Sequence, residues 1–285
     1  MNAPGVAAKT VLTPAAAPET AFFLSALHGF GPEARTALRH LAAWLLPLPP
    51  EGDVVGGLWL RRETALEDWR STPKLCAAAG CAPAAWGPPQ LVLCLLDSTA
   101  PVHRQGLIGT LARCEADTLA VVLAPPGQDA AALYADLLRH TRARLGVFET
   151  LNPEPLAREA LARALLASLY RENLICLDFA DLRTILPGTG VAWWYRQGEG
   201  LERLRAEQAR ITVHGEAIGV FCGVVAGADC AFEAFESFGE IVMTEVEGWE
   251  AAGVSTTVVS ACLIDARVIH GWDAFVFSAS RTLRR

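Results

Sequence analysis

Two uninterrupted apolar hexapeptides constrain the fold more than any other feature of this chain. Residues 91–96 read Leu-Val-Leu-Cys-Leu-Leu, and residues 119–124 read Leu-Ala-Val-Val-Leu-Ala before Pro125-Pro126. Short runs without polar alternation are typical of strands covered on both faces. Residues 33–46 and 129–142 have helical apolar spacing. This alternation of strand and helix predicts an α/β fold, with a parallel sheet and helices on both sides.

The rest of the first half is less regular. We expect a strand, a glycine turn and a helix from residue 21 to residue 46, with Pro32 in the first helical turn. The spacing also predicts strands over 54–60 and 145–148, an irregular stretch over 61–87, a loop over 97–106 and a helix over 107–116.

A long central helix is expected over residues 153–171, because apolar residues recur there at three and four positions. Beyond Gly188 the pattern changes to an α+β layer. It has expected strands over 191–195, 217–225, 255–264 and 269–278, and expected helices over 200–209 and 230–246.

Between the central helix and Pro187 lies a stretch with two carboxylates, Asp178 and Asp181. If this stretch opens a helix, their spacing places both on one face, near the positive end of the helix dipole. Taken from the residues alone, this is a capped helix start.

The same stretch resembles a known motif. Ile-Cys-Leu-Asp-Phe-Ala-Asp-Leu-Arg-Thr-Ile, residues 175–185, is similar to the synergy loop of FtsZ, the bacterial relative of tubulin, which reads Asn-Val-Asp-Phe-Ala-Asp-Val-Arg-Thr-Val. The resemblance implies that Asp178 and Asp181 enter the nucleotide site of a neighbouring subunit and help to position the attacking water. Arg183 and Thr184 match the family's Arg-Thr, whereas Cys176 replaces its Asn.

Residues 219–227, 236–240 and 257–259 also resemble FtsZ segments. The resemblance implies a Rossmann-like GTPase-type domain joined by a central helix to a smaller α+β domain. The expected boundaries are a flexible arm at 1–19, a degenerate GTPase-like domain at 20–152, the central helix and synergy loop at 153–186, and a C-terminal domain at 187–285.

The nucleotide pocket that this family requires is poorly represented. Its phosphate loop is Gly-Gly-Gly-Thr-Gly-Thr-Gly, and by order its counterpart is residues 97–106, with glycine at position 106 alone. Pro101 lacks an N–H donor, and Asp97 adds negative charge where phosphate would lie. His103 and Arg104 could offset that charge. The degenerate loops contribute Gly29, Gly31, Ser98, Thr99, Arg104 and Gly106 as candidate cofactor contacts.

Two further positions weaken the pocket. Gly29-Phe30-Gly31-Pro32-Glu33-Ala34 formally matches a G-x-G-x-x-A dinucleotide pattern, but Glu33 would repel phosphate. Pro155 and Leu156 stand where the family offers Asn or Asp to the guanine edge. Losing several charge-assisted hydrogen bonds, at about 1.5–3 kcal/mol each, disfavours GTP binding.

These features predict a pseudo-GTPase without cofactor or metal, and without intrinsic GTPase activity. Through its acidic loop it would associate with a GTP-binding FtsZ-like or tubulin-like paralogue and modulate filaments or GTP turnover. A nucleotide-independent scaffold that self-assembles into homo-oligomers or filaments, in cell division or membrane remodelling, is an alternative. A divergent active GTPase is another.

Composition sets further limits. A net charge of −7 and a pI of about 5.4 argue against a nucleic-acid partner. No apolar run approaches the ~20 residues that span a bilayer, and the first residues lack a signal-peptide pattern. Eight scattered cysteines are typical of a reduced cytoplasm, and Cys76 and Cys81 have no second ligand pair for zinc. The resemblance to FtsZ implies that this is a bacterial cytoplasm.

Three surface features complete the expectations. Strand alternation places one of Trp193 and Trp194 outward, so Trp194, like Arg183, is a candidate interface residue. Arg281, Arg284 and Arg285 end the chain. They could make weak contact with anionic lipid at the inner membrane face, although a solvated terminus is the simpler expectation.

Overall fold

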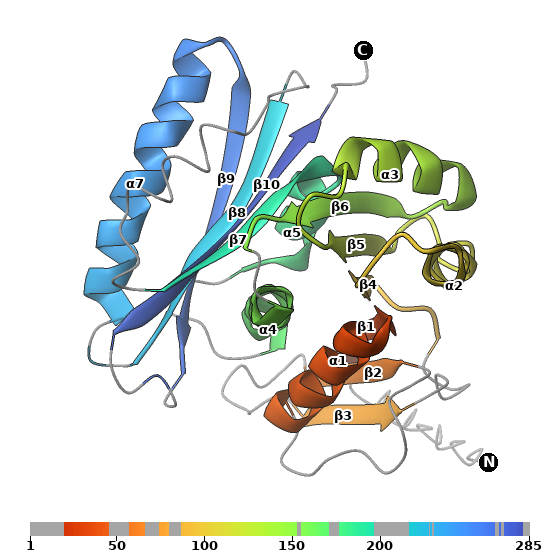
Figure 1. Ribbon diagram of the computed structural model, residues 1–285. Coiled ribbons are helices and arrows are strands. Elements are labelled where there is room, and N and C mark those ends of the chain that lie inside the picture. The colour runs from red at the N-terminus through yellow and green to blue at the C-terminus, as the bar shows by residue number, and fades with distance from the viewer. Residues whose placement is uncertain are drawn as a thin grey trace, which may run out of the picture.

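The computed structural model of the chain is an α/β fold in which the described residues form one ten-stranded sheet (Figure 1). The structure describes residues 20–45, 57–65, 74–79, 87–152, 155–170, 177–196, 217–227, 229, 231–265, 268 and 271–281. The expected arm at 1–19 and the expected helix at 200–209 lie outside these residues.

The strand order is β3-β2-β1-β4-β5-β6-β7-β10-β8-β9. The first six strands in the chain are β1 (Thr20–Phe30), β2 (Leu58–Ala65), β3 (Lys74–Ala79), β4 (Leu91–Leu96), β5 (Leu119–Ala124) and β6 (Arg144–Thr150). The last four are β7 (Gly188–Arg196), β8 (Ala217–Ala226), β9 (Ser255–Ile264) and β10 (Trp272–Arg281).

The middle of the sheet is parallel, as the apolar hexapeptides predict. Strands β1, β4, β5, β6 and β7 pair in parallel, and so do β8 and β9. Every residue of β4 and β5 is buried, because helices cover both faces of these strands. The parallel expectation does not hold at one edge, where β2 and β3 form an antiparallel meander beside β1. In the second half, β10 lies inside the sheet and runs antiparallel to β7 and β8.

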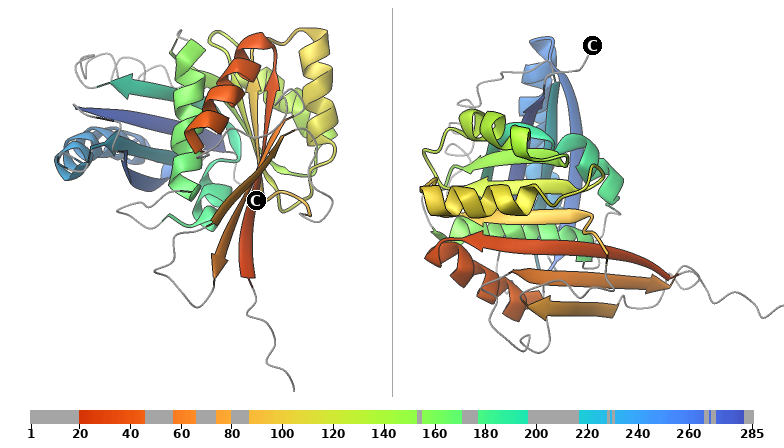
Figure 2. Two further views of the ribbon diagram at one scale, coloured as in Figure 1. Left: turned by 90° about the horizontal axis from the view of Figure 1, so that it is seen from below. Right: turned by 90° about the vertical axis from the view of Figure 1, so that its right-hand side faces the viewer.

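The helices divide between the two faces. Those in the described part of the chain are α1 (Pro32–Leu45), α2 (Pro101–Leu111), α3 (Ala130–Leu137), α4 (Pro155–Tyr170), α5 (Phe179–Ile185) and α7 (Ala231–Ala251), with a 3-10 turn at Leu138–His140. Residues of α1, α4 and α5 share one hydrophobic core. Helices α2 and α3 cover the other face of the first strands, while α7 covers the end of the sheet near β8 and β9 (Figure 2).

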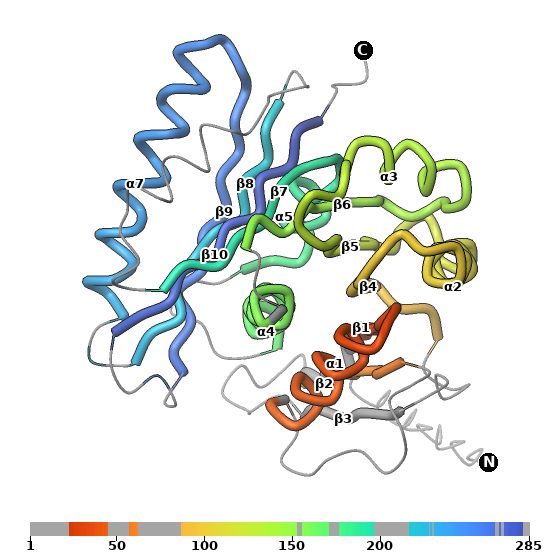
Figure 3. Tube along the Cα trace, in the orientation of Figure 1, coloured from red at the N-terminus to blue at the C-terminus, as the bar shows by residue number. Residues whose placement is uncertain are grey.

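Helix α4 occupies a central position. It packs on α1 and also on β7 and β9, so it lies between the first strands and the last strands of the sheet (Figure 3). Leu161 and Leu165 on this helix are fully buried, as the three- and four-residue spacing predicts, whereas Leu156, in the same pattern, is exposed because it lies in the first turn of the helix. Because β6 pairs with β7, the sheet is continuous across residue 187.

Two local expectations were wrong, and a third gave a strand that is longer than expected. The stretch 61–87 is not wholly irregular, because it contains the end of β2 and all of β3. The expected loop over 97–106 ends at Ala100, since Pro101 starts α2 with its fixed φ and missing N–H. Strand β6 spans Arg144–Thr150 rather than the brief run expected over 145–148.

Candidate functional site

The junction between β1 and α1 is a glycine turn at the carboxyl end of a parallel strand, the usual place for a ligand in such sheets. Gly31 has φ of +119°, in the region that favours glycine. A Cβ on Gly29 would lie 2.8 Å from the backbone carbon of Ala34. The first glycine therefore lets α1 pack closely on the turn.

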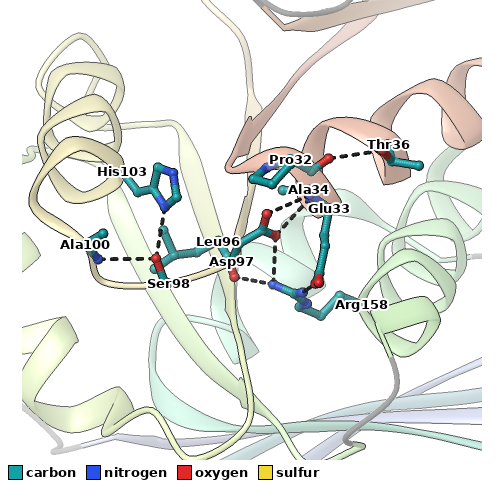
Figure 4. A network of polar contacts seen from close by, with 10 residues as sticks. All are labelled: Pro32, Glu33, Ala34, Thr36, Leu96, Asp97, Ser98, Ala100, His103 and Arg158. Atoms are coloured by element: carbon teal, nitrogen blue, oxygen red, sulfur yellow. Dashed lines mark hydrogen bonds and ion pairs between the residues drawn. The ribbon is translucent and has the colours of Figure 1, made fainter.

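The Asp97 carboxylate, at the end of β4, lies at the N-terminus of α1 (Figure 4). The backbone N–H groups of Glu33 and Ala34 each donate to one of its oxygens, at 2.8 Å. Gly31 has no side-chain oxygen with which to cap the helix, so a residue distant in sequence performs that role. A Cβ on Gly31 would lie 2.2 Å from Asp97 Oδ2.

No free donor remains in the first turn of α1. Pro32 has no N–H, Glu33 and Ala34 donate to Asp97, and the Arg35 N–H donates to the Gly31 carbonyl at 3.1 Å. A phosphate at this helix end would need those donors and would meet a carboxylate. The anion position is thus filled by the chain itself.

Arg158 of α4 supplies the positive charge beside that carboxylate. Its side chain is 7% exposed, and its Nη1 lies 3.3 Å from Asp97 Oδ1 and also donates to the Leu96 carbonyl. Its Nη2 donates to Glu33 Oε2 at 2.9 Å. Such a buried guanidinium needs anionic partners, and here two carboxylates of the same chain provide them (Figure 4). The network closes the site without a ligand.

The other candidates from the loop after β4 point elsewhere. Ser98 Oγ lies 3.0 Å from His103 Nδ1, and Thr99 is exposed. Arg104 belongs to α2 and donates from Nε to Asp136 of α3 at 2.7 Å. This hydrogen bond lowers the pKa of Asp136, with Arg139 adding to the effect. Gly106 lies inside α2, where a Cβ would meet the Phe30 ring at 3.1 Å.

The described residues at the start of α4, where the guanine edge would lie, also offer no free polar group to a nucleotide. Leu156 is 57% exposed at the start of α4 and offers no polar group. Nearby, the buried Glu159 accepts from Arg163 at 2.6 Å and lies 2.8 Å from His40 Nδ1. The charged side chains between α1 and α4 thus bind each other.

The two acids of the FtsZ-like stretch lie at the start of α5, and both are exposed. Asp178 is the N-cap, because its Oδ1 accepts from the Ala180 N–H at 3.0 Å. Asp181 lies in the first turn, and neither acid forms an ion pair within the described residues. Arg183, in the last turn, has Nη1 3.6 Å from Asp117 Oδ1. The cap and a role toward a partner are compatible, since both carboxylates reach solvent.

Two expected surface residues are not free. Trp193 and Trp194 face opposite sides of β7, as the alternation predicts: Trp193 is buried in the core under α7, and Trp194 is half-buried against the core that α4 and α5 share. Trp194 is therefore less exposed than expected, and its role at an interface stays a prediction. Arg281 is also half-buried, and its Nη1 donates to the Thr184 carbonyl at 2.6 Å. Arg284 and Arg285 lie outside the described residues.

Metal and thiol chemistry find little support in the part of the chain that the structure describes. No group of three or more His, Cys, Asp or Glu side chains there could hold a metal ion. Cys94, Cys114, Cys222 and Cys262 are buried free thiols whose pKa values are raised, chiefly by burial. The side chains of Cys76 and Cys81 lie outside the description.

Sequence reasoning found Asp97 as a charge in the wrong place for phosphate but missed its partner. Arg158 was missed because the apolar spacing of α4 was used to find buried hydrophobic residues and not a buried cation. A charged residue within the apolar face of a predicted helix is the pattern that could have found it.

No protein-family model matches the chain, and a search of curated proteins finds no match. Among the described residues, no helix combines the length and apolarity needed to cross a bilayer. The fold and the site together define a Rossmann-like α/β protein whose turn at the usual ligand position is closed by its own Asp97.

Proposed function

We propose that this chain is a pseudo-GTPase of the FtsZ-like type, acting on a GTP-binding FtsZ-like or tubulin-like partner. One observation supports the absence of GTP binding: the Asp97 carboxylate accepts hydrogen bonds from both N–H groups that α1 would offer to a phosphate. With the buried Arg158 also committed to this carboxylate, GTP would have to displace an intramolecular anion to bind.

The two aspartates at the start of α5 support the proposed action on a partner. Asp178 and Asp181 are exposed and free of ion pairs among the described residues, which a role on a partner's nucleotide requires. In that role they would orient the attacking water beside the partner's γ-phosphate. A subunit that donates acids but presents no nucleotide would cap or stimulate a partner filament, acting as a polar adaptor in division or membrane remodelling.

The arrangement of helices is consistent with the FtsZ-like expectation. Helix α4 leads toward Asp178 and lies between the parallel strands and the strands β7 to β10. The sequence match to the synergy loop falls at this same point of the chain. Neither observation depends on the pocket, so they support the proposal independently of Asp97.

The test is GTP turnover by a purified FtsZ-like partner, measured with increasing amounts of this protein. The Asp178→Asn variant keeps an amide oxygen that can cap α5 but removes the charge, so folding is retained while turnover stimulation falls. Asp181→Asn tests the second acid, and Glu250→Gln, at an exposed acid of α7, is the matched control.

We expect both aspartate variants to lose the effect on the partner and Glu250→Gln to keep it. Equal activity of all variants would make the acids a helix cap only. Filaments of this protein alone without GTP would favour the scaffold alternative, and saturable GTP binding with turnover would favour the divergent enzyme.

A further inference from the structure

A large open cavity lies on another part of the molecule, between α3, the starts of β6 and β7, and the ends of α5 and β10. Its volume is about 810 Å³, within the range of small-molecule sites. Four arginines line it: Arg142, Arg144, Arg183 and Arg281. This concentration of positive charge is unexpected in a chain of net charge −7.

The cavity lacks the negative charge that would neutralise these arginines. No carboxylate belongs to its lining among the described residues, and Arg142 and Arg144 form no ion pair there. Arg183 approaches only Asp117, whose side chain is 91% exposed, at 3.6 Å. An exposed pair at that distance is weak and readily exchanged for another anion.

Arg281 differs from the other three because the fold holds it in place. Its Nη1 donates to the Thr184 carbonyl at 2.6 Å, which ties the end of β10 to α5. Its Nε is buried and has no hydrogen-bond partner among the residues that the structure describes. Burial also lowers the pKa of Arg281. A half-buried cation paired only with a carbonyl is stabilised further when an anion approaches.

The rest of the lining is of a different kind. Tyr134 and Leu138 of the α3 region present aromatic and apolar surface, and Thr184 and Thr189 contribute hydroxyl groups. Guanidinium groups bind phosphate oxygens in a fork geometry, and an aromatic surface favours a flat ring. A ligand with phosphate at one end and an aromatic ring at the other satisfies both parts.

We propose that this cavity binds a small phosphate-bearing ligand of the nucleotide class, held by Arg142, Arg144, Arg183 and Arg281 and separate from the closed turn at Asp97. The inference does not depend on the proposed function, because it uses none of the residues of that turn and neither acid of α5.

Titration calorimetry with inorganic pyrophosphate and with ADP, on the full-length protein, tests the inference. Arg144→Glu and Arg142→Glu alter exposed cavity residues, and Arg113→Glu, at the exposed end of α2 outside the cavity, makes the same charge change. Circular dichroism of each variant establishes that it folds. We expect saturable binding of both probes, at least tenfold weakened by either cavity variant and changed less than twofold by Arg113→Glu.

We expect ADP to bind more tightly than pyrophosphate, because only ADP reaches the apolar surface. Absence of saturable binding, or equal weakening by Arg113→Glu, would overturn the site. Equal affinity for the two probes would overturn the nucleotide class. Tighter, arginine-dependent binding of hexaglutamate would reassign the cavity to an acidic peptide, which also contradicts the proposal. Stimulation of the partner's GTP turnover is measured separately, so either idea can fail alone.

Discussion

Asp97 and Ala34, 63 positions apart in the chain, are joined by a 2.8 Å hydrogen bond from the Ala34 N–H to the Asp97 carboxylate. The bond joins the end of β4 to the first turn of α1, and the Asp97 N–H completes the connection by donating to the Phe30 carbonyl at 3.0 Å. The N–H groups at this helix end, which could otherwise bind a phosphate, are therefore already bound to a carboxylate of the same chain.

Replacing Asp97 by alanine should destabilise the protein. The change leaves the Glu33 and Ala34 N–H groups uncapped and removes one of the two carboxylates beside Arg158. We expect the free energy of unfolding to fall by about 1–3 kcal/mol, measured by urea denaturation. If the carboxylate replaces a bound anion, sulfate should raise the melting temperature of Asp97→Ala more than that of the wild type. An equal response to sulfate would contradict the idea.

Gly31→Ala should be far more damaging than alanine at another positive-φ glycine. Gly31 has φ of +119°, and the new Cβ would overlap Asp97. Gly127 has φ of +76° with nothing within 4 Å, so Gly127→Ala measures backbone strain alone. We expect a loss of about 1 kcal/mol for Gly127→Ala and at least about twice that for Gly31→Ala. Thermal denaturation of both variants provides the comparison, and similar losses would refute the close approach of Asp97.

The capping role of Asp178 predicts a difference between two substitutions. Asp178→Ala removes the oxygen that accepts from the Ala180 N–H and should cost about 1 kcal/mol of unfolding free energy. Asp178→Asn should change it by only a few tenths, because asparagine caps about as well. Chemical denaturation measures both. Loss of stability in Asp178→Asn equal to that in Asp178→Ala would mean that the charge, rather than the cap, stabilises α5.

The buried thiols predict sensitivity to alkaline pH. Burial raises the pKa of Cys222 from 9.0 to about 11, so the folded state favours the neutral thiol. This contribution to stability is complete below pH 9, falls as pH rises because the unfolded thiol ionises first, and is exhausted above pH 11. The loss amounts to at most about 3 kcal/mol. Cys222→Ala should therefore show a shallower fall of unfolding free energy over this range.

A matching measurement uses thiol reactivity. Because the thiolate is the reactive form, Cys94, Cys114, Cys222 and Cys262 should resist iodoacetamide at neutral pH in the folded protein and react after denaturation. Mass spectrometry of tryptic peptides identifies each site. Rapid labelling of Cys94 in the native state would contradict its full burial.

Much of the fold follows from local sequence. The runs at residues 91–96 and 119–124 can bury every side chain only as central strands, and they do. The apolar spacing over 155–170 identifies α4, and the acid at position 178 caps α5 as the capping rules predict. These features depend on periodicity and on neighbours within a few residues, which the sequence displays directly.

Other features depend on which strands become neighbours, and no local pattern encodes that. The antiparallel direction of β2 and β3, the approach of Asp97 to α1 and its pairing with the buried Arg158 all join residues far apart in the chain. The same holds for the cavity that Arg144 of β6 and Arg281 of β10 both line. The sequence by itself determined the buried strands β4 and β5, the helix α4 and the start of α5, through side-chain periodicity and capping. Only the tertiary structure decided where the charges lie, because electrostatic interaction depends on distance in space.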